Sequence, residues 1–183
     1  MKKSLPPSTV SMRAPVLKKK LKQKQVVSLL SLLPLRNIEK NGKDAVVYHG
    51  TSGSNYQHSI RDNGLHPIGK GRLGNGFYFT PSFAIAHHYA MEAADKKKAD
   101  TPVVLEILLR NVDQLKVTLY TESGFRAVVS ESTKKMTVQK LPSYNDIPAD
   151  IFASYIDKTF WQFIVRDPHI IQKHFVIRNA IYL

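Results

Sequence analysis

Residues 48–51, Tyr-His-Gly-Thr, begin at the last residue of a short strand predicted at 45–48. Gly50 has no side chain, so the backbone at this point can approach a ligand closely. A second stretch, residues 76–80 (Gly-Phe-Tyr-Phe-Thr), leaves a glycine-rich loop as another predicted strand and carries Tyr78. Tyr89 follows eleven residues later, on a predicted helix. Taken singly, each of these residues is more often a structural or packing position than a functional one.

The helix that carries Tyr89 is expected to start at Thr80 and Pro81, with Thr as the N-cap and Pro at the first helical position. It should run to about Ala94. The other predicted elements are a helix at 56–63 ended by Gly64 in the left-handed conformation, a mobile loop at 69–76, strands at 103–109, 115–119, 160–165 and 175–181, and a short helix at 148–157. Residues 121–146 show no clear pattern. Short strands with helices in no regular alternation predict an α+β fold.

The 183 residues are enough for one ordinary domain and a tail. Hydrophobic residues make up 43% of the chain and charged residues 22%, which is typical of a globular protein rather than a disordered one. The chain has no cysteine, so disulfides and thiolate metal sites are excluded. His87 and His88 are neighbours on the predicted helix. Their side chains therefore diverge, and we expect no metal site there.

Residues 1–44 hold eleven basic and two acidic residues, whereas 45–183 hold sixteen basic and twelve acidic ones. We expect a basic tail at 1–44, partly disordered, and one compact domain at 45–183. The apolar run at 26–35 is too short for a bilayer, which needs about 20 residues. A helix at about 26–40 that docks on the domain is expected instead. The tail is either a solvated arm or a contact for an anionic partner, such as a nuclear import signal, a membrane contact or a phosphate-binding arm.

Together these motifs resemble the ADP-ribosyltransferases of the diphtheria-toxin and poly(ADP-ribose) polymerase branch. Residues 49–51 match the family's His-Gly-Ser/Thr element, residues 76–79 match its Gly-x-Tyr-Phe element, and Tyr89 matches its second aromatic. Ala86 is similar to the toxin, because the polymerases usually have Ser there. Residues 161–177 resemble the terminal strand pair of the polymerases. The resemblance implies an ADP-ribosyltransferase-like fold, in which two packed, mostly antiparallel sheets form an NAD cleft with peripheral helices.

The resemblance also implies roles for individual residues. The backbone of Gly50 would hold the nicotinamide carboxamide, and His49 would bind a ribose hydroxyl with Thr51 close by. Tyr78 and Tyr89 would stack on the nicotinamide ring, each adding about 0.5–1.5 kcal/mol beyond area burial. NAD would be a co-substrate, and no metal is expected. The implied NAD-binding residues are His49, Gly50, Thr51, Tyr78, Phe79, Ala86 and Tyr89.

The implied catalytic residues are His49, Tyr78 and Gln162, and the third departs from the family. The family has a glutamate where this chain has Gln162, which keeps hydrogen bonding but loses the charge and any base function. Loss of a well-placed electrostatic group typically costs about 10²–10³ in rate. Two alternatives stay open: Glu122 or Glu131 enters the cleft from the unpatterned segment, or the domain binds NAD or ADP-ribose without turnover. Lys70 and Arg72 meet either the pyrophosphate or solvent.

The sequence therefore predicts an NAD-dependent mono(ADP-ribosyl)transferase that cleaves the nicotinamide glycosidic bond and transfers ADP-ribose to a protein or nucleic-acid acceptor. Chain elongation into poly(ADP-ribose) is the least expected activity, because it depends most on the glutamate. A basic nucleic-acid-binding protein is a further class, and it rests on the tail alone. No transmembrane segment is expected. The expected site of action is intracellular, in the nucleus or cytoplasm or, for a secreted effector, inside a host cell.

Overall fold

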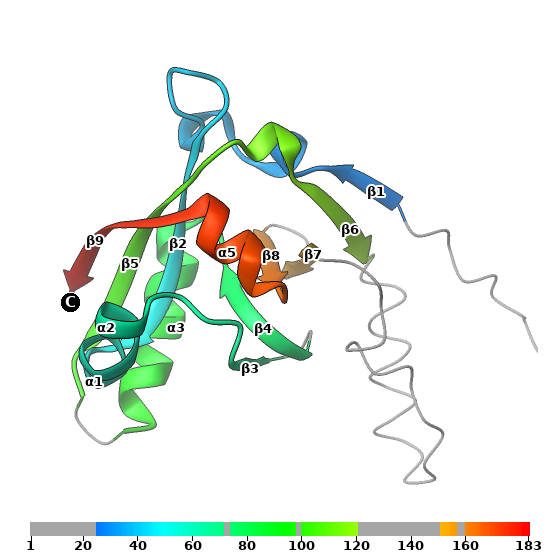
Figure 1. Ribbon diagram of the computed structural model, residues 1–183. Helices are drawn as coiled ribbons and strands as arrows, with labels where there is room; N and C mark the ends of the chain where they lie inside the picture. Colours follow the sequence, from blue (N-terminus) through cyan, green and yellow to red (C-terminus); the bar gives the residue numbers. More distant parts are fainter. Residues whose placement is uncertain (1–24, 72–73, 98–99, 121–150, 157–159) are drawn as a thin grey trace, which may run out of the picture.

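Two sheets form the framework of the protein, and the computed structural model describes them in residues 25–71, 74–97, 100–120, 151–156 and 160–183 (Figure 1). The larger sheet has the order β1 (Gln25–Ser28), β6 (Lys116–Tyr120), β7 (Ile151–Ile156), β8 (Phe160–Val165), β4 (Gly74–Phe79) and β3 (Gly69–Gly71). The smaller sheet has the order β2 (Ala45–Ser52), β5 (Pro102–Leu109) and β9 (Phe175–Tyr182). Only the β6–β7 pair is parallel among these described strands. The predicted α+β class is confirmed.

A cluster of buried phenylalanines joins the two sheets. The ring of Phe79 on β4 stacks on Phe163 of the neighbouring β8, with centroids 5.0 Å apart. Phe175 at the start of β9 meets Phe79 edge-on at 5.2 Å and Phe77 at 5.8 Å. Aromatic pairs in these geometries add about 0.5–1.5 kcal/mol each beyond area burial. The position of β4 relative to the smaller sheet is thus fixed from the core side.

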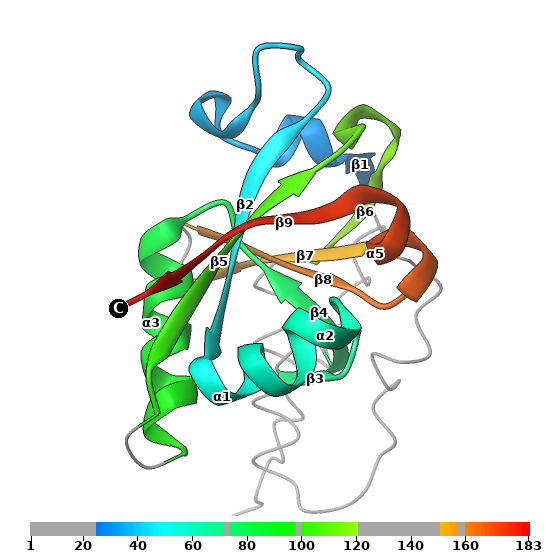
Figure 2. The same cartoon turned by 60° about the vertical axis from the view of Figure 1, so that its left-hand side comes forward.

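Helix α3 (Phe83–Asp95) covers the outer face of β2 and β5 (Figure 2). Its contact face is the i, i+4, i+8 series Ala86, Ala90 and Ala94, all buried. The helix carries Tyr89 as expected, but its N-cap is Ser82, whose side chain accepts a hydrogen bond from the Ile85 amide. The expected cap at Thr80 is wrong, because the backbone of Thr80 pairs with β2.

Two further predictions at the local level are corrected. The glycine-rich stretch 69–76, expected as a mobile loop, contains β3 and the start of β4, which pair as a hairpin with Gly69 opposite Gly76. Residues 151–156, expected as part of a helix, form β7, which pairs with β8 along its whole length and with β6 on its other side. The isoleucine, phenylalanine and tyrosine residues of this segment favour a strand. Between β2 and β3 the chain is helical as predicted, in α1 (Gly53–Asn55), the π-helical η3 (Tyr56–Ile60) and α2 (Arg61–Asn63).

The segment before β2 differs from the expected docking helix at about 26–40. It consists of β1, the 3-10 turns η1 (Leu29–Leu32) and η2 (Leu35–Asn37), and a bridge between Ile38 and Ala45. Pro34 explains the break, because a residue before proline avoids the helical region, and Leu33 is extended at ψ 138°. Leu29 and Leu33 belong to the core, so the folded unit includes residues 25–44 rather than beginning at 45. Residues 1–24 lie outside the described part.

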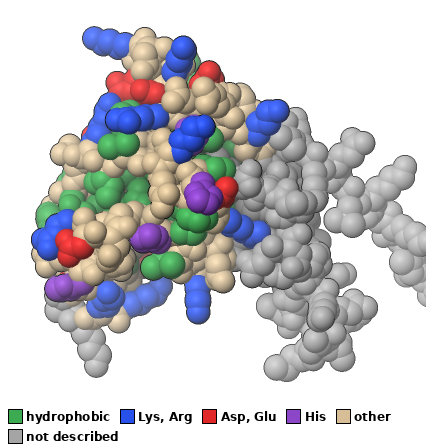
Figure 3. Space-filling model, viewed as in Figure 1, with side chains coloured by type: hydrophobic (Ala, Val, Ile, Leu, Met, Phe, Trp, Pro, Cys, Tyr) green, Lys and Arg blue, Asp and Glu red, His purple; other side chains and the backbone are tan. Residues whose placement is uncertain are grey.

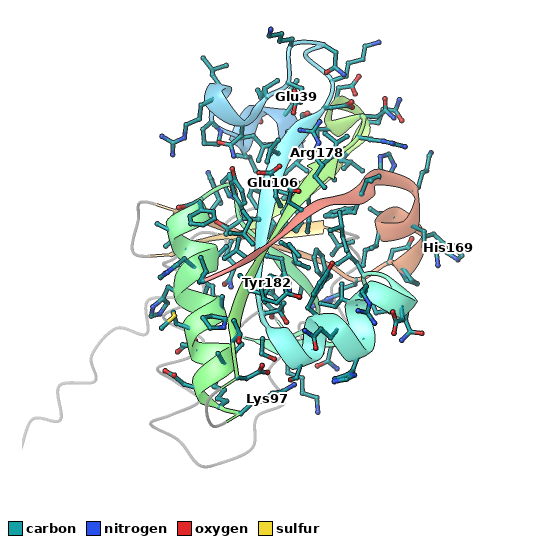
Figure 4. All side chains as sticks on the ribbon, turned by 90° about the vertical axis from the view of Figure 1, so that its left-hand side faces the viewer. Glu39, Lys97, Glu106, His169, Arg178 and Tyr182 are labelled. Carbon is teal, nitrogen blue, oxygen red and sulfur yellow. The ribbon has the colours of Figure 1, made fainter. Side chains whose placement is uncertain are left out.

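The C-terminal region closes the fold. Helix α5 (Pro168–His174) is capped by the Asp167 side chain and leads directly into β9. The η4 turn (Val112–Gln114) connects β5 to β6. Arg178 on β9 forms an ion pair of 2.5 Å with Glu39, and Figure 4 shows the two side chains meeting above the smaller sheet. Within the described ranges no helix combines the length and apolar character that crossing a bilayer requires.

Asn37 ties the segment before β2 to two other elements. Its buried Nδ2 group donates to the Val46 carbonyl on β2 and to the Pro81 carbonyl between β4 and α3, each at 2.8 Å. Both amide protons are used, and a carboxylate of the same shape has none to offer. Asn37 therefore braces the point where β2 and β4 meet.

We expect Asn37→Asp to lower the free energy of unfolding by at least about 2 kcal/mol, since a buried charge would face two carbonyl oxygens. Urea unfolding at neutral pH measures the change. Asn179→Asp, on the exposed side of β9, makes the same chemical change in water and should stay within about 0.5 kcal/mol of wild type. Equal losses in both variants would contradict the bracing role of Asn37.

Candidate active site

A cavity of about 860 Å³ lies where β2 and β4 separate. The C-terminal half of β2 and the end of β4 form one side, helix α3 forms another, and residues 55–71 form the opposite wall. All eight residues predicted to bind NAD or to act in catalysis border this one cavity: His49, Gly50, Thr51, Tyr78, Phe79, Ala86, Tyr89 and Gln162. The structure thus brings together side chains that lie up to 113 positions apart in the sequence.

The closed end of the cavity is a short seam between β2 and β4. The Tyr48 amide donates to the Thr80 carbonyl at 2.8 Å, and the Thr80 amide donates back to the Tyr48 carbonyl at 2.9 Å. In a continued antiparallel ladder, Gly50 would be the next residue on this edge of β2 and would pair with Tyr78. That pairing does not form, and the two strands diverge.

His49 ends the seam. Its Nδ1 lies 2.7 Å from the Tyr78 carbonyl oxygen. Because a carbonyl only accepts, Nδ1 carries the proton and the neutral ring keeps a lone pair on Nε2. The imidazole also lies against Phe77, with ring centroids 4.7 Å apart. The His49 side chain thus makes the hydrogen bond to the Tyr78 carbonyl that the β2 backbone would have made in a continued ladder.

Gly50 is left with its backbone groups facing the cavity. In a strand, the amide and carbonyl of alternate residues point to the same edge. Those of Tyr48 point to β4, so those of Gly50 point to β4 as well, where the strands have separated. A Cβ on Gly50 would lie 2.0 Å from the Ala86 carbonyl oxygen, so glycine is required for the approach of α3. One N–H and one C=O, side by side on a rigid strand, suit a planar carboxamide.

The protonation of His49 follows from its surroundings. Burial lowers the pKa of His49 below its usual 6.5, and the hydrogen bond to the Tyr78 carbonyl opposes this shift in part. The neutral form therefore prevails at pH 7. A neutral imidazole with Nδ1 occupied presents Nε2 as a hydrogen-bond acceptor, which suits a hydroxyl of a ligand.

Tyr78 is backed by the β3 strand. A Cβ on Gly71 would lie 2.6 Å from Cζ of Tyr78, and one on Gly69 would lie 3.5 Å from Cδ2. The ring therefore lies directly against the glycine hairpin, which explains why two residues of β3 lack side chains. Tyr89 borders the same cavity from α3 and is half-buried.

Gln162 lies on the same face of the larger sheet as Tyr78. Tyr78 pairs with Ile164, and Gln162 is two residues further along β8, so the two side chains are diagonal neighbours. The alternatives Glu122 and Glu131 are in the segment 121–150, which lies outside the described residues. Arg72 also lies outside them. Lys70 borders the cavity.

Two predicted NAD-binding residues have mainly a packing role in the structure. Phe79 is 2% exposed and its ring belongs to the phenylalanine cluster. Ala86 is fully buried, with its carbonyl turned to Gly50. Both border the cavity, but their side chains hold its walls together. Their roles toward a ligand remain predictions.

Sequence reasoning missed two polar residues that border the far end of the cavity, Asn55 and Lys97, and the hydrogen bonds that hold them. Asn55 donates from Nδ2 to the Thr51 hydroxyl at 2.8 Å and so fixes that side chain. Ser54 donates to Asp100, and Lys97 donates to Ser54 at 3.0 Å. Figure 4 shows Lys97 at the end of α3 beside α1. The available signal was Ser52 directly after the His-Gly-Thr motif, because serine is a common N-cap and here caps the helix that carries Asn55.

The charge of the cavity wall is positive. Lys70, Lys96 and Lys97 border it, against the single described carboxylate of Glu92. Such a wall favours an anionic ligand group. No group of three or more potential metal ligands occurs within the described ranges.

Two packed, mostly antiparallel sheets with a cavity at their junction are consistent with an ADP-ribosyltransferase fold. The model of the poly(ADP-ribose) polymerase catalytic domain matches residues 15–178, and the chain belongs to this family. Members of the family use NAD as substrate. A comparison with curated proteins gave no significant match.

We expect the free energy of unfolding to depend on pH because the pKa of His49 is lowered in the folded protein. As pH falls below 6.5, the unfolded chain binds a proton at this residue before the folded protein does, so the free energy of unfolding decreases. The difference between wild type and His49→Gln should be constant between about pH 7 and 9 and should become smaller below 6.5. Urea unfolding across this range measures it. A difference that grows on acidification would mean that the folded protein favours the charged ring.

We expect Gly71→Ala to weaken NAD binding about tenfold, or about 1.4 kcal/mol, because the new methyl group displaces the end of the Tyr78 ring. Isothermal titration calorimetry with NAD measures this. Gly71 is exposed, so the unfolding midpoint should change little. In the Tyr78→Ala background the substitution should have no further effect, since there is no ring to displace. A full additional loss in that background would rule out this mechanism.

Proposed function

We propose that the protein is an NAD-dependent mono(ADP-ribosyl)transferase. The observation that carries the proposal is the separation of β2 and β4 beyond the seam. There the His49 imidazole hydrogen-bonds to the Tyr78 carbonyl, and the Gly50 amide and carbonyl face the cavity. These two backbone groups would bind the carboxamide of nicotinamide and fix the plane of its ring. Tyr78 and Tyr89, which border the same cavity, would hold the ring by stacking.

The rest of the dinucleotide would lie along α3. His49 Nε2 would accept a hydrogen bond from a ribose hydroxyl, since the neutral ring has its lone pair on that atom. The pyrophosphate carries two negative charges, and Lys70, Lys96 and Lys97 on the cavity wall would offset them. Thr51, held by Asn55, would contact the adenosine half.

The reaction would break the bond between the ribose C1′ and the nicotinamide nitrogen. The bonding electrons leave with neutral nicotinamide, and C1′ becomes oxocarbenium-like. Gln162 would accept or donate a hydrogen bond at the nicotinamide-ribose 2′-hydroxyl but has no charge to stabilise this state. An acceptor nucleophile then forms the new bond at C1′.

We favour mono-transfer over chain elongation because the two reactions differ in whether the acceptor must lose a proton. A ribose hydroxyl, the acceptor in chain elongation, must lose a proton as it attacks, and Gln162 cannot take one. A carboxylate on a protein acceptor is already ionised at neutral pH and brings its own negative charge to the electron-poor sugar. We therefore favour a single transfer to an anionic acceptor group.

A second candidate, favoured by the same Gln162, is a module that binds NAD or ADP-ribose without turnover. The nucleic-acid-binding alternative has less support from the described residues. Figure 3 shows Lys and Arg side chains scattered over one face of the domain rather than gathered in a stripe. The largest excess of basic residues lies in 1–44, most of it outside the described part.

A nicotinamide-release assay tests the proposal. Wild type should release nicotinamide from NAD, and His49→Ala and Tyr78→Ala should each lower the rate by at least about 10²-fold. Gln162→Glu should raise the rate by about 10²–10³-fold, and Gln162→Ala should lower it. His58→Ala and Tyr182→Ala remove the same residue types from exposed positions away from the cavity and should match wild type.

The outcomes separate the candidates. NAD binding without nicotinamide release, together with activity gained in Gln162→Glu, would identify the binding module. A protein that neither binds NAD nor releases nicotinamide, in wild type and in Gln162→Glu alike, would refute the proposal. Labelled NAD followed by mass spectrometry of the products then shows whether one or several ADP-ribose units are attached.

A further inference from the structure

Thr80 connects three elements around the closed end of the cavity. It is 3% exposed, and its backbone makes both hydrogen bonds of the seam with Tyr48 on β2. Its hydroxyl donates to the Trp161 carbonyl on β8 at 3.1 Å and accepts from the Ser82 amide, at the start of α3, at 3.2 Å. A single side chain thus joins β8 to the point where β2 and β4 separate.

The Thr80 hydroxyl acts where the regular pairing has ended. β4 and β8 pair from Phe77 opposite Val165 to Phe79 opposite Phe163, and the ladder goes no further. The hydrogen bond from the Thr80 side chain to the Trp161 carbonyl adds one more contact between the chain after β4 and strand β8, one residue beyond the end of the ladder. A valine would fill the same volume but would leave the Trp161 carbonyl without this donor.

The carbonyl that Thr80 holds belongs to the peptide unit that leads into Gln162. A peptide unit is planar, so fixing the oxygen of Trp161 also fixes the direction of the Gln162 amide and limits the path to its Cα. The other end of the same residue fixes Tyr48, two positions before Gly50. Through Thr80, the geometry of Gln162 is set relative to that of Gly50.

We propose that Thr80 is a positioning residue, which holds Gln162 at the correct place relative to the nicotinamide-binding backbone of Gly50. The inference rests on the proposed function for its kinetic consequences. Thr80 does not need to touch NAD to act. It determines how Gln162 meets the ribose when the glycosidic bond breaks, and not how firmly Gly50 holds the carboxamide.

The variant Thr80→Val tests this inference in the full chain. We expect kcat for nicotinamide release to fall about 10- to 10²-fold, with KM for NAD within about twofold of wild type. Thr80→Ser keeps the hydroxyl and should restore most of kcat. In the Gln162→Ala background, Thr80→Val should cost little more, since the side chain that it positions is gone. Thr101→Val removes a hydroxyl from an exposed threonine and should leave the kinetics unchanged.

A second measurement does not depend on catalysis. In ¹³C,¹⁵N-labelled protein, Thr80→Val should shift the Trp161 carbonyl carbon and the Gln162 amide nitrogen more than the same atoms of Phe163 and Ile164. Unchanged shifts at Trp161 and Gln162 would overturn the inference, whether or not the protein turns over NAD. Equal kinetic losses in the presence and absence of the Gln162 side chain would overturn it as well. An inactive wild type refutes the proposed function, and the shifts then decide on Thr80 alone.

Discussion

The pair of hydrogen bonds between Tyr48 and Thr80 is the constraint from which the rest of the site follows. It joins the two sheets at one point, and immediately beyond it the strands must either continue to pair or leave backbone groups without partners. Unpaired buried amides and carbonyls are costly, so native folds nearly always satisfy them. At this seam the His49 imidazole hydrogen-bonds to the Tyr78 carbonyl, and the backbone amide and carbonyl of Gly50 face the cavity beside it.

Such an opening needs rigid surroundings, and the packing on both faces provides them. On the core side, the stacked rings of Phe79 and Phe163 meet Phe175 and keep β4 in place. On the outer side, α3 approaches Gly50 so closely that no side chain fits between them. Asn37 braces the same junction through Val46 and Pro81. The strands thus separate locally, between firmly packed neighbours, and the separation does not spread along β2.

The sequence was informative where local chemistry and final structure agree. The resemblance to the family's motifs predicted that Gly50 and Tyr78 share a cleft, and both border the cavity, although each motif alone is more often structural. Their roles toward NAD stay predictions. The hairpin at 69–76 could not be predicted, since Gly69 and Gly71 lie against the Tyr78 ring and Gly76 lies against Ile164, contacts that no local pattern reveals. The strand at 25–28 is set by pairing with β6, more than 80 positions away, which no local pattern reveals. Asn37 and Thr80 resemble ordinary capping residues in the sequence, and only the distant carbonyls that they bind give them their roles.

Gln162 and the neutral state of His49 have a common consequence for the chemistry. In the proposed reaction neither residue would take a proton from the acceptor, because Gln162 has no basic atom and burial lowers the pKa of His49. The one described carboxylate on the cavity wall, Glu92, lies one helical turn beyond Tyr89 on α3 and one turn before Lys96. On the proposed function, the described wall would supply binding and orientation and would leave proton transfer to the acceptor. An acceptor that is ionised before it arrives would meet this requirement without further help, so the proposal makes the charge of the acceptor a condition of the reaction.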